Sequence, residues 1–252
     1  MKKIVITIFV LFVLCFTIFA QAEIETKGNQ INVVASTTWV ASYAQIAGLK
    51  NVECVAPGTM IHPPEYEIKV SDIQKIMKAD YFIYAGYEAM MKTISENVSP
   101  ESTVQIQIDT FNSYENIASQ ARKIAKIANT ETQCEENLRK LKTLLDESKE
   151  KLESQGINEV PCYCHFHQQY LAKDLGLNVL DIFGPSPLDS SQIQLVSKNK
   201  YPLIIDNVHN PIANVLLDVS KDSKIVVWRN FPVEVEDNSL FNLIKNNIDT
   251  LL

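Results

Sequence analysis

The chain has 252 residues, 46% of them hydrophobic, and a formal net charge of -7. This length permits one large domain or two small ones, and the apolar content is sufficient for well-packed cores. Because the chain is acidic and has no cluster of Lys and Arg, we expect no nucleic-acid partner.

The N-terminus predicts export. Lys2 and Lys3 precede an almost unbroken apolar run at residues 4–19, and Ala20 and Ala22 form an A-x-A cleavage signal. We interpret residues 1–22 as a signal peptide that carries the protein across the membrane, to the periplasm or the cell surface. An uncleaved membrane anchor is the alternative, because the run approaches the lower spanning length of about 17 residues.

Residues 23–113 predict an N-terminal α/β lobe. A β-branched run is followed by a helix that ends at Gly48, and Pro57 and Gly58 end the second strand. Strands that alternate with helices indicate a parallel sheet covered on both faces. The expected strands are 31–35, 52–55 and 81–84, and the expected helices are 39–47 and 71–78.

Residues 114–156 predict a long linking helix. Apolar residues recur at helical spacing, Lys and Glu fill the other positions, and Gly and Pro are absent before Gly156. The pattern permits one helix, or two with a break near Asn129 and Thr130. We interpret the segment as a stiff connector, with a surface helix hairpin as the alternative.

Residues 157–252 resume the βα rhythm and predict a C-terminal α/β lobe. The expected fold is α/β, with two open parallel-sheet lobes, a long rigid connecting helix and a ligand cleft between the lobes. The expected strands are 160–164, 177–183, 203–206 and 224–228, and the expected helices are 168–175, 190–197, 211–219 and 239–252.

The four histidines, His62, His165, His167 and His209, each follow the carboxyl end of a predicted strand. Open α/β sheets bind ligands at that edge. Neutral imidazole suits zinc, copper, iron and nickel, and added carboxylates extend the range to manganese. A single histidine at such a place is more often a solvated or core residue, so only the four histidines together indicate a metal site.

The run from Cys162 to His167 has the pattern Cys-x-Cys-His-x-His. His165 and His167 point the same way in an extended chain, so they form a possible ligand pair. The cysteines could instead be buried or form disulfides. Cys164 and His165 point in opposite directions along a strand, and nucleophile-elbow, phosphate-loop and zinc-protease motifs are absent, so we expect no enzyme and no catalytic residue.

Three stretches resemble the zinc and manganese receptors of ABC importers. Residues 31–36, followed by a helix, are similar to the family's first strand and helix. Residues 55–67 are similar to the family pattern P-G-x-D-P-H-x-Y-E, whose histidine is a metal ligand and corresponds to His62. Residues 165–176 resemble H-D-A-F-G-Y-F-A-K-x-Y-G, and the second-lobe ligand corresponds to His165. The resemblance implies two lobes joined by a rigid helix.

The chain also departs from that family. Asp109 stands where a second histidine is usual, and the carboxylate expected after the last strand is missing near Arg229. His167, His209 or Cys164 could compensate. Other candidate oxygen ligands are Glu65, Glu67, Asp206 and Asp237, each of which could also be a surface acid or, for Asp206, a helix cap.

We therefore expect an extracytoplasmic solute-binding protein that captures zinc or manganese and delivers it to the membrane permease of an ABC importer. It would act as a monomer with no organic cofactor. One alternative is a receptor for a larger metal chelate or cofactor, with Trp39, Tyr66 and Trp228 as aromatic walls; another is an extracellular adhesion or interaction protein. The expected metal ligands are His62 and His165, followed by Asp109, His209 and His167.

Overall fold

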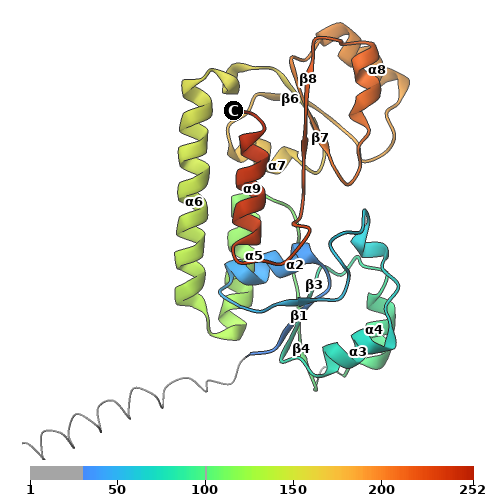
Figure 1. The fold of residues 1–252 in the computed structure, drawn as a ribbon, viewed down its shortest axis with the longest axis vertical. Coiled ribbons are helices and arrows are strands. Elements are labelled where there is room, and N and C mark those ends of the chain that lie inside the picture. The colour runs from blue at the N-terminus through green and yellow to red at the C-terminus, as the bar shows by residue number, and fades with distance from the viewer. Residues whose placement is uncertain (1–30, 100) are drawn as a thin grey trace, which may run out of the picture. The chain divides into compact units, whose positions relative to one another are not determined.

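The computed structural model describes residues 31–99 and 101–252 (Figure 1). The predicted signal peptide at 1–22 lies outside these residues. Asn32–Leu252 form one compact unit. None of the helices described is both long enough and apolar enough to cross a bilayer.

The first lobe is built on a four-stranded parallel sheet with the order β2-β1-β3-β4. Its core is an apolar cluster that includes Val34, Ile76, Phe82 and Ile94. The strands are β1 (Val33–Ala35), β2 (Glu53–Cys54), β3 (Tyr81–Tyr84) and β4 (Val104–Gln107), and the helices are α2 (Thr38–Ile46), α3 (Val70–Met77) and α4 (Met91–Asn97), with a short 3-10 turn η1 (Pro63–Glu65).

The sequence patterns predicted β1 to β3, α2 and α3 but not α4 or β4. β4 is an edge strand in which Gln105 and Gln107 alternate with Val104 and Ile106, and Ile106 is its one buried residue. An edge strand needs little apolar sequence because one side of its ladder is unpaired. β4 therefore lacks the apolar run that marks the inner strands.

The linking segment contains two helices, α5 (Tyr114–Ala128) and α6 (Glu131–Ser154). Asn129 adopts a left-handed conformation with φ of 56°, which ends α5. The hydroxyl of Thr130 then donates to the carbonyl of Ala47 at 2.6 Å and attaches the turn to α2. Of the two predicted alternatives, the one with a break near Asn129 and Thr130 is confirmed.

The second lobe repeats the topology of the first, with a parallel sheet in the order β6-β5-β7-β8. Residues 211–219 were expected to be an α-helix, but Ala213–Asp218 form the 3-10 helix η3. Its start is held by Asp206, whose carboxylate accepts from the amide of Ala213 at 2.9 Å. The strands are β5 (Cys162–His165), β6 (Val179–Phe183), β7 (Leu203–Asn207) and β8 (Lys224–Trp228), and the helices are α7 (Gln169–Asp174) and α8 (Ser190–Asn199), with the 3-10 turn η2 (Ile157–Glu159) before β5.

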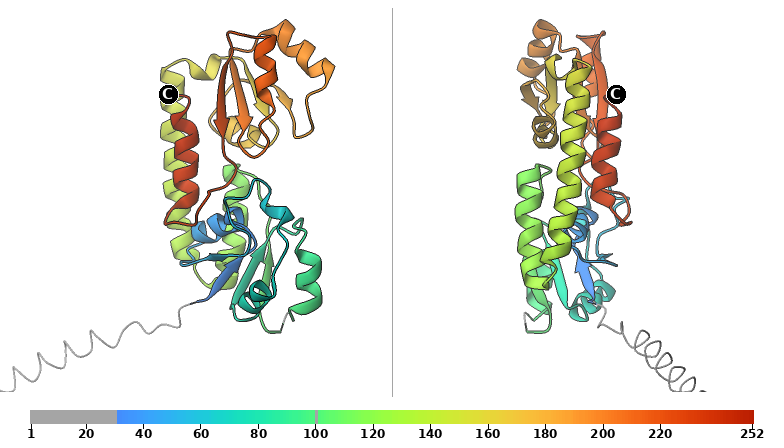
Figure 2. Two further views of the ribbon diagram at one scale, coloured as in Figure 1. Left: turned by 45° about the vertical axis from the view of Figure 1, so that its right-hand side comes forward. Right: turned by 90° about the vertical axis from the view of Figure 1, so that its left-hand side faces the viewer.

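The last helix, α9 (Ser239–Asp249), follows β8 but packs against α2 and α6 (Figure 2). The side chain of Gln45 on α2 accepts from the hydroxyl of Ser239 at 2.6 Å and donates to the carbonyl of Glu236 at 2.7 Å. The chain therefore returns from the second sheet to the helices of the first lobe.

Candidate metal-binding site

The two sheets have the same switch point in strand order, between the first and third strand of each lobe. In the second lobe these are β5 and β7. His165 is the last residue of β5, and His209 and Asn210 follow β7. Ligands of open α/β sheets bind at the carboxyl ends of such strands.

His165 is fully buried and is held at both ring nitrogens. Its Nε2 lies 2.9 Å from Oδ1 of Asn210, and its Nδ1 accepts from the amide of His167 at 3.2 Å. The edge of its ring meets Phe183 at a centroid distance of 5.4 Å. The ring therefore has one fixed orientation.

His167 lies beside His165, with ring centroids 5.5 Å apart. Burial lowers the pKa of His165, and the hydrogen bond to Asn210 and the charge of Asp206 partly oppose this shift. Burial also lowers the pKa of His167. Both rings are therefore neutral at pH 7, which is the protonation state that a metal requires.

His209 is buried against Phe231, on which it stacks with a centroid distance of 3.7 Å. Burial lowers its pKa to about 4, the charges of Arg229 and His62 contribute in the same direction, and the backbone of Ile61 opposes them. Its Nε2 is buried and has no hydrogen-bond partner among the described residues. His209 thus connects the edge of the second sheet with the loop that carries His62.

The remaining candidate ligands are two exposed residues of the first lobe and a buried carboxylate of the second. His62 is exposed and precedes η1. Asp109 is exposed after β4, where its carbonyl accepts from Asn116 at 3.1 Å. Asp206 is buried, and its oxygens accept backbone amides of Asn207 and Ala213, so it is a cap.

The structure brings the candidate ligands together in pairs and not as a complete shell. Within residues 31–99 and 101–252, no three His, Cys, Asp or Glu side chains form a group that could hold a metal ion. His165 and His167 form one pair, and His209 lies within electrostatic reach of His62.

The cysteines of β5 are not placed as ligands. Cys162 and Cys164 are fully buried, and the hydrogen bond between them and their burial raise the pKa of Cys164 well above its usual range. A metal binds the thiolate, so this thiol is a poor donor. The four cysteines in the described part of the chain, Cys54, Cys134, Cys162 and Cys164, are all unpaired.

The aromatic walls expected for a large chelate are not all available. Trp228 is fully buried, and its indole donates to Thr250 at 2.9 Å. The indole of Trp39 donates to Asn112 at 3.0 Å, and Asn112 donates to the carbonyl of Asn230 at 2.7 Å. Trp39 thus belongs to a hydrogen-bonded connection between the lobes.

Sequence reasoning missed a buried carboxylate at the switch point of the first lobe. Glu88 is 3% exposed and accepts from the hydroxyl of Ser36 at 2.5 Å and from the amides of Ala85 and Gly86 at 2.9 and 2.6 Å. All three donors lie at the ends of β1 and β3. The signal that could have revealed it is an acid two residues after the glycine that follows a buried strand.

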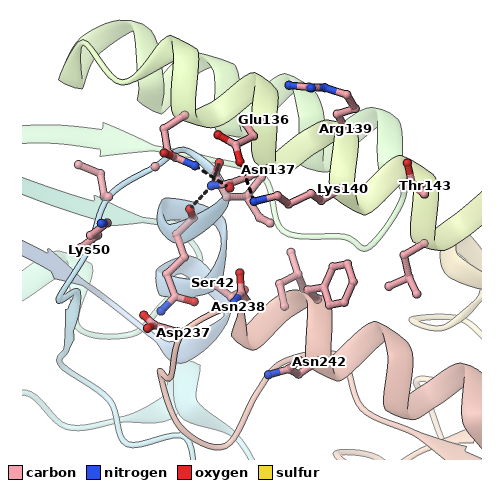
Figure 3. Close-up of a pocket in the computed structure, with 18 of the residues that line it drawn as sticks. Ser42, Lys50, Glu136, Asn137, Arg139, Lys140, Thr143, Asp237, Asn238 and Asn242 are labelled. Atoms are coloured by element: carbon pink, nitrogen blue, oxygen red, sulfur yellow. Dashed lines mark hydrogen bonds and ion pairs between the residues drawn. The ribbon is translucent and has the colours of Figure 1, made fainter.

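A groove of about 940 Å³ lies between α2, α6 and α9 (Figure 3). Lys50, Arg139 and Lys140 line it together with Glu136 and Asp237. Its lining contains none of the five predicted metal ligands, and Asp237 faces this groove instead of the histidines.

Comparison with known proteins gives a family and a fold. A family model described as ZnuA, zinc-uptake complex component A, periplasmic, matches residues 33–251. No curated protein matches the chain. Among solved structures, the laminin-binding protein Lmb of Streptococcus agalactiae is 16% identical with a TM-score of 0.66, covering 88% of this chain and 98% of its own. Lmb is described as bifunctional, with adhesin and metal-transporting activity.

Two further structures are similar to the chain. AdcAII of Streptococcus pneumoniae is 15% identical with a TM-score of 0.65, over 88% of this chain and 98% of AdcAII. A manganese-bound periplasmic metal-binding protein of Candidatus Liberibacter asiaticus is 17% identical with a TM-score of 0.62, over 87% and 99% of the two chains. The predicted resemblance and the two-lobed α/β fold are confirmed.

Proposed function

Because the chain belongs to the ZnuA family, the metal-binding receptor component of ABC importers, we propose that it binds its cation at His165 and His167. The single observation that carries this assignment is the pair of adjacent imidazoles, with ring centroids 5.5 Å apart, at the carboxyl end of β5. The metal would be a transported cargo, so a site that is only partly assembled suits capture followed by release.

The spacing of the pair supports one shared ion. Two imidazoles bound to one tetrahedral zinc at about 2.0–2.1 Å place their ring centroids about 5 Å apart. The rings of His165 and His167 are 5.5 Å apart, so a small adjustment would suffice. An all-imidazole pair favours zinc over manganese, which prefers oxygen ligands.

The first lobe would complete the shell through His62. This side chain is exposed and is electrostatically coupled to His209, which precedes Asn210. His62 also corresponds to the histidine of the family pattern. Asp109 is the second candidate from the first lobe, since its carboxylate is exposed and forms no hydrogen bond in the described part of the chain.

The family supplies the partner class, which is the membrane permease of an ABC importer. We propose that the chain reaches this partner as an exported monomer after removal of residues 1–22. The apolar run followed by Ala20 and Ala22 supports the export route.

The test is the zinc stoichiometry and affinity of the purified protein. We expect one zinc per chain in the wild type, and an affinity at least about 100-fold weaker when His165→Ala and His167→Ala are combined, since both donors are lost. Gln194→Ala, exposed on α8, is the control. Unchanged binding in the double variant would refute the assignment.

A further inference from the structure

We propose that His165 binds its metal through Nδ1, and that Asn210 is the positioning residue that fixes the ring for this task. This inference rests on the proposed function. It adds a residue outside the predicted ligand set and specifies which atom of His165 faces the ion.

The hydrogen bonds define the tautomer of His165. The amide of His167 donates to Nδ1 at 3.2 Å, so Nδ1 carries a lone pair. A neutral imidazole has one donor and one acceptor nitrogen, so the proton is on Nε2. Nε2 then donates to Oδ1 of Asn210 at 2.9 Å.

The packing around the ring of His165 also favours Nδ1 as the metal-binding nitrogen. A Cβ on Gly184 would lie 2.7 Å from Nε2 of His165, and Cδ1 of Ile212 lies 3.3 Å from that same position. Gly184 therefore approaches Nε2 too closely to carry a side chain, and Asn210 contacts the same nitrogen. The backbone amide of His167 contacts the opposite, Nδ1 side, and the centroid of the His167 ring lies 5.5 Å from that of His165.

A metal ion at Nδ1 would displace one long hydrogen bond and keep the other. The displaced contact is the one from the amide of His167, whose length of 3.2 Å is at the weak end of the range. The retained contact from Nε2 to Asn210 is the type of outer hydrogen bond that orients a metal-binding histidine. Asn210 thus keeps a lone pair directed at the ion position before the ion arrives.

The direct test uses protein with ¹⁵N-labelled histidine, titrated with zinc ions and followed by long-range ¹H–¹⁵N NMR. We expect Nδ1 of His165 to shift on zinc binding while Nε2 keeps its proton. Loss of the Nε2 proton with a metal shift at that atom would overturn the inference and leave the proposed function standing. Zinc binding that moves neither nitrogen would overturn both.

The variants test the role of Asn210. Asn210→Ala should weaken zinc binding about 10- to 100-fold, as expected for loss of an outer hydrogen bond. Asn210→Asp supplies a carboxylate acceptor and should restore the affinity and the Nε2-protonated tautomer. Asn214→Ala, exposed on η3, is the matched control and should bind like the wild type.

Each result for these variants has a defined meaning. An Asn210→Ala protein that binds zinc with wild-type affinity would overturn the inference. An Asn210→Asp protein that remains as weak as Asn210→Ala, while its histidine spectrum shows a native fold, would also overturn it.

Discussion

The switch points of the two sheets have the same topology and opposite chemistry. In the first lobe, Glu88 accepts three hydrogen bonds from groups at the ends of β1 and β3, including the hydroxyl of Ser36. In the second lobe, the switch point holds His165, the last residue of β5, whose Nδ1 accepts from the amide of His167. The carboxylate of Glu88 accepts three hydrogen bonds, whereas Nδ1 of His165 accepts only one, at 3.2 Å.

We infer from this difference that the first switch point has a structural role and the second a metal-binding role. The first switch point stabilises the lobe, and its candidate ligands His62 and Asp109 lie on exposed segments around it. The second switch point holds the buried ring of His165 in one orientation, with the half-buried His167 beside it. We infer that the second lobe provides the preformed half of the metal site and that the first lobe provides the adaptable half.

The largest expected effect concerns Glu88, which we interpret as a stabilising residue of the first lobe. Glu88→Ala leaves three donors without their acceptor, and each buried unsatisfied donor costs about 1–3 kcal/mol. We expect the free energy of unfolding in urea to fall by at least about 3 kcal/mol. Glu96→Ala, exposed on α4, is the control, and equal stability of the two variants would contradict the interpretation.

The second lobe should make stability depend on pH through its buried histidines. The pKa of His209 is lowered from 6.5 to about 4, so below pH 6.5 the unfolded chain takes up a proton that the native chain refuses. The free energy of unfolding should therefore fall as the pH drops from about 6.5 to about 4, by at most about 3 kcal/mol for this residue. Urea titrations of wild type and His209→Gln check this, and an unchanged slope in the variant would rule it out.

The packing around His165 can be tested with two glycines of similar conformation. Gly184 and Gly156 have φ of 74° and 69°, but an added Cβ at Gly156 meets nothing within 4 Å, whereas at Gly184 it meets His165. Both Ala variants carry the strain of a positive φ, about 1 kcal/mol. We expect only Gly184→Ala to weaken zinc binding as well, by about tenfold or more. Equal zinc affinities would show that the ring is not confined.

The smallest expected effect concerns Arg229. Burial is the largest cause of the lowered pKa of His209, and the charge of Arg229 is the second. Arg229 forms no ion pair with any described residue. Arg229→Gln should raise the pKa of His209 measured by NMR titration while leaving it below the usual value, because burial is the larger cause. No upward change would remove Arg229 from the electrostatics of the site.

Much of the fold could be predicted from local patterns. The apolar runs that form β1 and β7 are strong signals because these strands are buried at every residue. The apolar spacing of α5 and α6 is a strong signal because each helix buries one face. β4 escaped prediction because an edge strand needs few apolar residues. The cap at the start of η3 was one of the two interpretations of Asp206, but the sequence did not indicate that the segment would form a 3-10 helix.

The details of the site depend on contacts that sequence does not reveal. His165 and His167 were expected to share a side because of their spacing in an extended chain, but β5 ends at His165 and a turn at residues 166–168 brings the two rings together. The contact between His165 and Asn210 joins residues 45 positions apart. Asn210 stands before a proline in a turn, where sequence reading predicts only a loop. The burial of His209 by Phe231 likewise depends on the path of the chain after β8.

The most direct measurement is an anomalous-scattering map from crystals of the zinc-loaded protein. The account predicts one zinc peak at about 2.0–2.1 Å from Nδ1 of His165 and from a ring nitrogen of His167. It also predicts that Nε2 of His165 still faces Asn210. A zinc peak away from both rings would contradict the account.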